Sequence, residues 1–349
     1  MVTIINGTNN TDKKKGIVIL IIVLLIGAIF YQLDKQINSG VNNNQLSTTD
    51  KLNISNILEF PQGTITTKIV DISLFNRKWI DVPYASKSNS QKMDIFLPNN
   101  GSGPFPVIML IHGGAYKSGD KRDMLTNLAD ILDRGYAVVS VNYRLIDEAI
   151  FPAQIYDIKA AIRFIRANTS KYNIIPDKMA TWGESAGGHL SALAGTSGDG
   201  SSLDDPSLGN SDQSTKIQAC VDWYGPINFL TMDDQFKQSG IDGQVHNVAT
   251  SSESLLIGKA ITLAPDLVKK ANPETYISTD DPPIYIQHGT KDIIVPVQQS
   301  TNFYNNLIKY VDSEKISYES VQDAVHGDPY FRTKDNVDKV LNFLDKYLK

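Results

Sequence analysis

The sequence predicts an α/β fold, with a mostly parallel twisted sheet and helices on both faces. Short apolar runs recur along the chain, for example at 107–111 and 136–141, and such runs are typical of strands buried on both sides of a parallel sheet. Segments with apolar residues at helical spacing separate these runs. Regular alternation of strand and helix indicates a parallel sheet covered by helices.

Seven strands are predicted from these runs. In chain order they cover residues 93–97, 107–111, 136–141, 179–182, 217–223, 284–287 and 316–321. Pro98 ends the first strand, because proline has no N–H to donate to a sheet.

Four helices are predicted from apolar residues three or four positions apart. Their apolar series begin at Met124, Ile155, Leu190 and Val337. Gly135 ends the first helix and Pro152 opens the second, as these residues commonly do. Two segments interrupt the alternation. Residues 197–216 are rich in Gly, Ser and Asp and read as a surface loop, and residues 226–280 read as an insertion over the mouth of the site.

The bulk composition excludes several classes of protein. The chain has 349 residues, a formal net charge of −5 and one cysteine. No Lys/Arg-rich stripe appears in its body, so no nucleic-acid partner is expected. Cys220 cannot form an intramolecular disulfide and is predicted to be a buried small residue. Metal-ligand and nucleotide-binding motifs are missing, so neither a metal nor a cofactor is predicted.

The strongest local signal is the G-x-S-x-G run at 183–187. It lies between a predicted strand that ends at Trp182 and a helix that begins near Ala186. In that context the small residues allow a sharp strand-to-helix turn, which lifts the hydroxyl of Ser185 clear of the sheet. Ser185 is therefore the candidate nucleophile. The alternative is a glycine-rich turn with an idle serine.

A serine nucleophile needs a base. The chain has histidines at positions 112, 189, 246, 288 and 326. Where this motif occurs, the acid and then the histidine follow the serine along the chain. His326 is the histidine that follows the strand at 284–287 and its loop, and it is the predicted general base and acid. His112, His189 and His288 are interpreted as structural.

The acid of such a triad follows the carboxyl end of a strand. Asp292 comes after the strand at 284–287 by a short glycine turn and is the predicted acid. It would hold the imidazole tautomer and stabilise the imidazolium. Asp222, which also ends a strand, is the rival.

Backbone donors for an oxyanion are predicted in two places. Gly113 and Gly114 follow the strand at 107–111, and Ala186 begins the helix after the nucleophile. Each such donor typically lowers the barrier by roughly 3 kcal/mol. Glu184 adjoins the nucleophile, but neighbouring side chains at a turn point apart, so a structural polar contact is the interpretation there.

The combined motifs resemble the α/β-hydrolase fold carboxylesterases, and within them the acetyl-xylan and feruloyl esterase-like branch related to the hormone-sensitive lipase family. The resemblance runs from about residue 80 to the C-terminus. The residues that carry it are H-G-G-A at 112–115, V-N-Y-R-L at 141–145, G-E-S-A-G-G at 183–188, D-W-Y-G-P at 222–226 and H-G-T-K-D at 288–292.

This resemblance implies an α/β-hydrolase fold with the triad Ser185, Asp292 and His326. It also implies a serine carboxylesterase that hydrolyses short-chain, acetyl-type esters through an acyl-enzyme, on a small-molecule or saccharide ester substrate. An amidase or peptidase of the same fold is one alternative. A hydrolase fold that only binds is another, although an intact serine, acid and histidine in the right order argue against it.

The N-terminal residues differ from the rest of the chain in composition, with a lysine cluster followed by a long apolar run. Residues 1–15 end in three lysines and are expected in the cytoplasm, and 16–33 form a predicted transmembrane helix of roughly 27 Å. Residues 34–60 read as a flexible linker to the hydrolase domain at 61–349. The lysines favour a single-pass anchor in the cell membrane with the catalytic domain outside. The alternative is a cleaved signal peptide and a secreted protein.

Overall fold

A computed structural model describes residues 70–349 of the protein. The predicted cytoplasmic segment (1–15), membrane anchor (16–33) and linker (34–60) lie outside the described residues. Between residues 70 and 349, none of the helices has the length and apolar character needed to cross a bilayer.

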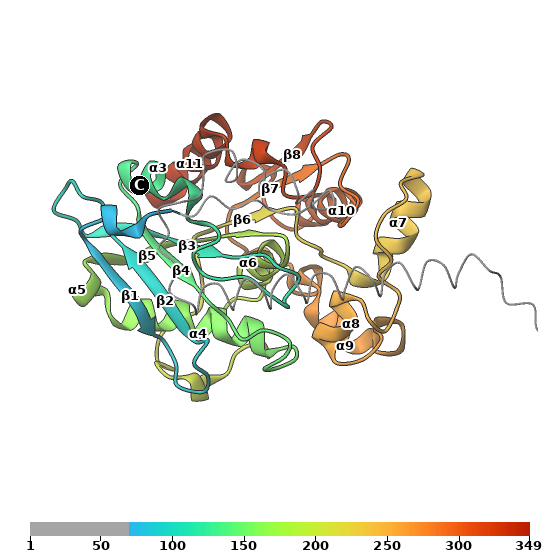
Figure 1. Ribbon diagram of the computed structural model, residues 1–349, viewed down its shortest axis with the longest axis horizontal. Coiled ribbons are helices and arrows are strands. Elements are labelled where there is room, and N and C mark those ends of the chain that lie inside the picture. The colour runs from blue at the N-terminus through green and yellow to red at the C-terminus, as the bar shows by residue number, and fades with distance from the viewer. Residues whose placement is uncertain (1–69) are drawn as a thin grey trace, which may run out of the picture. The chain divides into compact units, whose positions relative to one another are not determined.

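The centre of the fold is a mixed sheet in the order β1-β2-β4-β3-β5-β6-β7-β8 (Figure 1). β2 runs antiparallel to both of its neighbours, β1 and β4, and all later neighbours are parallel. The strands are β1 Lys78–Pro83, β2 Lys92–Phe96, β3 Phe105–Ile111, β4 Ala137–Val141, β5 Ile174–Glu184, β6 Ala219–Trp223, β7 Ile284–Gly289 and β8 Ile316–Val321.

All seven predicted strands are present, and the structure adds β1. This strand was missed because it lies at the edge of the sheet, where its side chains are only half-buried and leave no apolar run. The pairing of β1 with β2 also shifts register between Trp79 and Val82. The prediction of a mostly parallel sheet holds from β4 to β8, whereas the β1–β2–β4 side is antiparallel.

Helices cover both faces of the sheet, as predicted. One face carries α4 (Ala153–Ala167), α6 (Ala186–Thr196) and α10 (Gln298–Leu307), and the other carries α3 (Leu128–Asp133) and α11 (Lys334–Leu348). A four-residue helix, α5 (Thr169–Tyr172), precedes β5. The predicted first helix is shorter than its apolar series, because the chain forms a 3-10 turn over Leu125–Asn127 before α3 begins.

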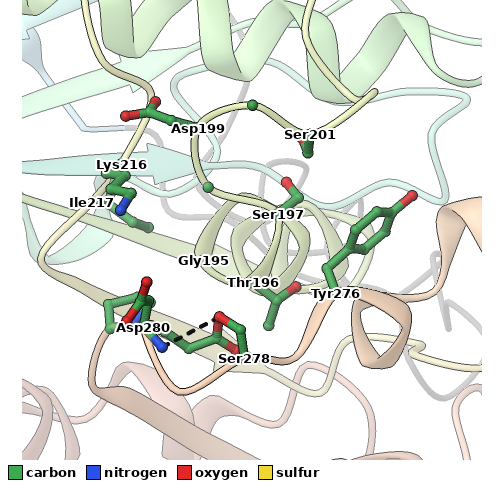
Figure 2. A pocket seen from close by; sticks show the side chains of 14 residues that line it. Gly195, Thr196, Ser197, Asp199, Ser201, Lys216, Ile217, Tyr276, Ser278 and Asp280 are labelled. Atoms are coloured by element: carbon green, nitrogen blue, oxygen red, sulfur yellow. Dashed lines mark hydrogen bonds between the residues drawn. The ribbon is translucent and has the colours of Figure 1, made fainter.

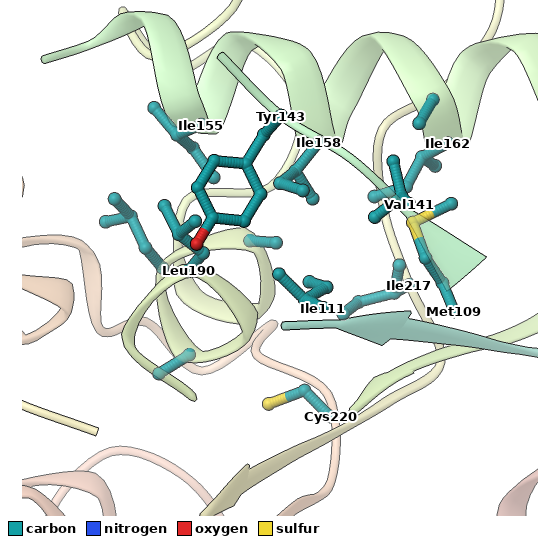
Figure 3. Packing of buried hydrophobic residues seen from close by; sticks show 14 of the residues in the cluster. Met109, Ile111, Val141, Tyr143, Ile155, Ile158, Ile162, Leu190, Ile217 and Cys220 are labelled. Carbon is teal, nitrogen blue, oxygen red and sulfur yellow. The ribbon is translucent and has the colours of Figure 1, made fainter. Parts of the chain in front are cut away.

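Alternation along the central strands supplies two apolar cores. In β3, Met109 and Ile111 belong to the core beneath α4 and α6, where Ile158 and Leu190 also lie (Figure 3). Leu110, between them, belongs to the core beneath α3 and α11. Cys220 is fully buried in the first core, as predicted.

The segment at 226–280 holds the helices α7 (Met232–Ser239), α8 (Ser252–Ile257) and α9 (Pro265–Ala271). It is tied to the rest of the domain by backbone hydrogen bonds. The N–H of Gln244 donates to the carbonyl of Ile293 at 2.7 Å, and the N–H of Phe151 donates to the carbonyl of Leu256 at 2.8 Å. The segment therefore contacts both the loop after β7 and the start of α4.

Candidate active site

Ser185 lies on a tight turn between β5 and α6, with φ 53° and ψ −122°, a backbone conformation that L-residues rarely adopt. Two glycines make the turn possible. A Cβ on Gly183 would lie 1.9 Å from the carbonyl oxygen of Gly187, and one on Gly187 would lie 2.0 Å from that of Ile111. The predicted strand–turn–helix context of the serine is confirmed.

The fold brings the three predicted triad residues together from three separate elements. Ser185 Oγ lies 2.9 Å from His326 Nε2, and His326 Nδ1 lies 2.7 Å from Asp292 Oδ2. Asp292 accepts at Nδ1, so that nitrogen carries the proton and Nε2 of the neutral ring is free to accept from the serine hydroxyl. The order and distances are those of a nucleophile, its base and the residue that orients the base.

The carboxylate of Asp292 is fully buried yet richly hydrogen-bonded. Its Oδ1 accepts from the N–H groups of Ile294 at 2.7 Å and Val295 at 2.8 Å. Burial alone would raise the pKa of Asp292, but the charge of His326 and the hydrogen bonds from His288 and His326 outweigh burial and hold the pKa well below its ordinary range. Asp292 is therefore ionised at neutral pH.

His288 holds the acid in place, a role that the sequence did not reveal. Its Nε2 lies 3.2 Å from Asp292 Oδ2 and 2.9 Å from the carbonyl oxygen of Val295, and its Nδ1 lies 2.7 Å from Ser300 Oγ. Because the Val295 carbonyl can only accept, Nε2 carries a proton that also points at the carboxylate. The structural interpretation of His288 is confirmed, with this addition.

Asp222, the rival acid, lies elsewhere. It is fully buried at the end of β6, and its Oδ1 accepts from the N–H of Gly225 at 2.9 Å. Its Oδ2 has no hydrogen-bond partner among the described residues. Burial raises the pKa of Asp222 to about 6, opposite to the effect at Asp292. Asp222 makes no hydrogen bond to His326 and supports the turn instead.

The predicted oxyanion loop passes directly over the nucleophile. A Cβ on Gly113 would lie 3.2 Å from Ser185 Cβ and 3.0 Å from the carbonyl oxygen of Glu184. Within residues 70–349, the N–H groups of Gly113, Gly114 and Ala186 donate to no protein acceptor. They remain available to a ligand, and their role as oxyanion donors stays a prediction.

The same loop contains three consecutive residues with positive φ angles, which the sequence did not reveal. Gly114, Ala115 and Tyr116 have positive φ angles of 102°, 55° and 62°. The hydroxyl of Tyr116 lies 2.9 Å from Nδ1 of His189, and Nε2 of His189 donates to the carbonyl of Ala271 at 2.7 Å. Burial lowers the pKa of His189 to about 4, so this histidine is neutral and structural, as predicted.

His112 is also structural. It is buried, its ring stacks on Tyr143 with 4.4 Å between the centroids, and its Nδ1 lies 2.8 Å from the carbonyl oxygen of Gly113. The hydroxyl of Tyr143 donates to the carbonyl of His112 at 3.0 Å. Tyr143, from the V-N-Y-R-L motif, therefore supports the oxyanion loop.

A further hollow, apart from the triad, could hold a ligand. Among residues 70–349, no group of three or more His, Cys, Asp or Glu side chains is arranged to bind a metal ion. A hollow of about 310 Å³ lies at the far end of α6 from Ser185, with Thr196, Ser197 and Tyr276 on its wall (Figure 2). It contains no predicted site residue, so it is separate from the triad.

The fold and site define the class of protein: an eight-stranded sheet of this order, with a serine on the turn after β5 and its histidine and aspartate on later loops, is an α/β-hydrolase. Comparison with known proteins agrees. Residues 93–307 match the BD-FAE family. The chain belongs to this family.

Relatives and solved structures are esterases by name. The chain is 30% identical over 255 residues to the probable carboxylic ester hydrolase LipM of Mycobacterium tuberculosis, covering 71% of this chain and 55% of that protein. A truncated carbohydrate esterase from gut microbiota is 34% identical with a TM-score of 0.71, covering 80% of this chain and 99% of that one. A bifunctional GH43-CE protein of Bacteroides eggerthii is 33% identical with a TM-score of 0.70, covering 77% of this chain and 38% of that one.

The chain spans about half the length of the curated relatives it matches, namely 55%, 56% and 53% of the first three. The resemblance to α/β-hydrolase carboxylesterases is confirmed by these comparisons.

The two aspartates can be separated by matched substitutions. Asp292→Asn should lower kcat on an ester by about 10⁴-fold, because the amide favours the wrong imidazole tautomer. Asp222→Asn keeps an oxygen for the N–H of Gly225 and should change kcat by less than about 10-fold. Steady-state kinetics on the two purified variants checks this. An equal loss in both would contradict the assignment of the acid.

Asp222 should also make stability depend on pH. Its pKa is raised by burial from 3.8 to about 6, so its contribution to stability is complete below about pH 4 and is lost as pH rises through about 6. The asparagine of the Asp222→Asn variant cannot ionise, so the variant does not lose this stability as pH rises. Relative to wild type, the variant should therefore gain roughly 3 kcal/mol in free energy of unfolding between pH 4 and pH 8, at about 1.4 kcal/mol per pKa unit. Urea unfolding of both proteins across this range measures it, and a pH-independent difference would refute it.

Proposed function

We propose that the protein is a serine carboxylesterase that hydrolyses short-chain, acetyl-type esters through an acyl-enzyme. One observation carries the proposal: Ser185 Oγ, His326 and Asp292 form a continuous hydrogen-bonded chain beside backbone N–H groups that have no acceptor in the described part of the protein. Acyl transfer needs both parts, a nucleophile with its base and donors for the oxyanion.

In the proposed reaction, His326 Nε2 takes the proton of Ser185 as Oγ attacks the acyl carbon. The carbonyl oxygen becomes an oxyanion and accepts hydrogen bonds from the N–H groups of Gly113, Gly114 and Ala186. The C–O bond to the alcohol then breaks, and His326 returns the proton to the leaving oxygen. Water, activated by the same histidine, frees the acid from the serine.

Asp292 keeps its charge throughout. Its buried carboxylate faces the Nδ1–H of His326 and stabilises the imidazolium that exists while the proton is on the ring. His288 and two backbone N–H groups keep that carboxylate from rotating. The base is thus held in the tautomer that attack requires.

A small acyl group on a sugar or another polar alcohol is the proposed substrate. Support comes from the name of a similar protein, a carbohydrate esterase from gut microbiota. Two alternatives remain. An amidase of the same fold would use the same triad to cleave an amide, and a hydrolase fold that only binds would not use the triad for catalysis.

Ser185→Ala tests the reaction class. Wild type should turn over a short-chain aryl acetate, and the variant should lose about 10⁴- to 10⁶-fold in kcat, because attack has no other nucleophile. Acetylated xylan and a matched anilide complete the panel. Faster release of acetate from xylan than from the aryl ester supports the saccharide substrate, and faster anilide cleavage favours an amidase. No turnover by folded wild type on any of them would favour the binding module.

We also propose that residues 16–33 anchor the protein in the cell membrane, with the hydrolase domain outside. The lysine-flanked apolar run supports this. The full chain should sediment with membranes and be degraded by protease added to intact cells, whereas a chain that begins at residue 34 should do neither. Recovery of a shortened, secreted form from the full chain would favour a cleaved signal peptide instead.

A further inference from the structure

Glu184 stands next to the nucleophile in the chain, but its side chain makes no hydrogen bond to Ser185 Oγ or to His326. It is 1% exposed, and its Oε2 accepts from the guanidinium of Arg332 and from the hydroxyl of Tyr224 at 3.2 Å. The expected structural polar contact is thus present, but it is a buried ion pair with a phenol added to it. A buried charge of this kind is stable only while its partners remain in place.

The ion pair joins the two segments that must meet for catalysis. Glu184 is the last residue of β5, immediately before the nucleophile, and Arg332 ends the 3-10 turn Pro329–Arg332, which follows His326 on the same loop. The carbonyl of Arg332 also accepts from the side-chain amide of Asn127 at 3.0 Å. The position of the loop that carries the base is therefore tied directly to the strand that carries the nucleophile.

Tyr224 connects this pair to the imidazole itself. Its ring meets the ring of His326 edge to face, with 4.8 Å between the centroids, and packs in the same way against Phe331 at 4.6 Å. Its backbone is held at φ 45°, and its N–H donates to the carbonyl of Gln287 at 2.8 Å. With its hydroxyl on Glu184 and its ring against His326, Tyr224 limits how far the imidazole can turn.

Solvent has little room to replace these partners. The cavity beside Glu184 and Arg332, which Trp182 and Trp223 also line, measures about 10 Å³, room for at most about one water molecule. Burial raises the pKa of Glu184, and the charge of Arg332 and the Tyr224 hydrogen bond offset this only in part. Loss of either partner would leave the other unsatisfied inside the protein.

We propose that Glu184, Arg332 and Tyr224 are positioning residues, which set the distance and orientation of His326 relative to Ser185 and fix the local charge that the imidazolium meets. The inference deepens the proposed esterase function and rests on it. His326 is faced by Asp292 and Ser185 at its two nitrogens, by the phenol of Tyr224 at its side, and by the Glu184–Arg332 pair beyond that phenol.

Glu184→Gln tests the proposal, because it keeps the shape and removes the charge. We expect kcat to fall roughly 10- to 100-fold with KM almost unchanged, as expected for a misplaced base. Arg332 then has no carboxylate opposite it, and its uncompensated positive charge disfavours the imidazolium. The acidic limb of the kcat/KM profile should therefore move to lower pH. A purely structural role would not move that limb in folded protein.

Two further variants sharpen the test. The double variant Glu184→Gln with Arg332→Met has lost both charges, so the acidic limb of its pH profile should return towards wild type. Its kcat should stay low, because the ion pair that links the His326 loop to β5 is lost. Recovery of kcat would overturn the proposal. It would show that Glu184 and Arg332 only neutralise each other's charge and do not position His326. Asp204→Asn is the matched control: it removes a carboxylate between α6 and β6 that pairs with the buried Arg163 of α4, neither of which contacts a triad residue by a hydrogen bond, and it should leave kcat and the profile unchanged.

The readouts separate this inference from the proposed function. The rate at which a fluorophosphonate labels Ser185 reports the nucleophile–base pair without any ester substrate, and it should fall in Glu184→Gln even if no ester is turned over. Circular dichroism confirms folding. If Glu184→Gln does not fold, Tyr224→Phe decides, with an expected several-fold loss in kcat and in labelling rate. Unchanged kcat, labelling and pH profile in the folded variants overturn the proposal.

Discussion

The close approach of backbone segments around Ser185 is the constraint on which the rest of the site depends. Gly187 lies against the end of β3, and Gly113 of the next loop lies against the carbonyl of Glu184, at distances that leave no room for a Cβ on Gly187 and little on Gly113. This contact holds the serine in its unusual backbone conformation and puts free N–H groups beside it. The loops after β7 and β8 then supply the side chains of Asp292 and His326.

The environment of each buried carboxylate decides its chemistry. Asp292 receives two backbone N–H groups and two histidines, so its charge is stable in the interior. Asp222, one strand away, receives one backbone N–H, and burial there favours the neutral acid. Glu184 depends on an arginine and a phenol. Three acids near one serine thus differ in role through the number of donors that face them.

The sequence was informative where local pattern and chain order determine structure. The buried strands were readable as apolar runs, and Ser185, Asp292 and His326 followed from one motif and the order of its partners. β1 and α10 were not found, because the half-buried edge strand leaves no apolar run and α10 has few apolar residues to reveal its buried face. The support from His288, Tyr224 and Arg332 depends on contacts that form only in the folded chain, up to 148 positions apart for Arg332 and Glu184.

The contacts of the 226–280 segment limit how it can be redesigned. Its Ala271 carbonyl accepts a hydrogen bond from Nε2–H of His189, whose Nδ1 is hydrogen-bonded to the hydroxyl of Tyr116 in the oxyanion loop. Its His246 reaches the carbonyl of Ile294, next to the acid, at 2.9 Å. A segment transplanted from a homologue to change substrate preference must reproduce an acceptor and a donor at these two points. A replacement segment that lacks them would disturb the oxyanion loop and the loop that carries Asp292.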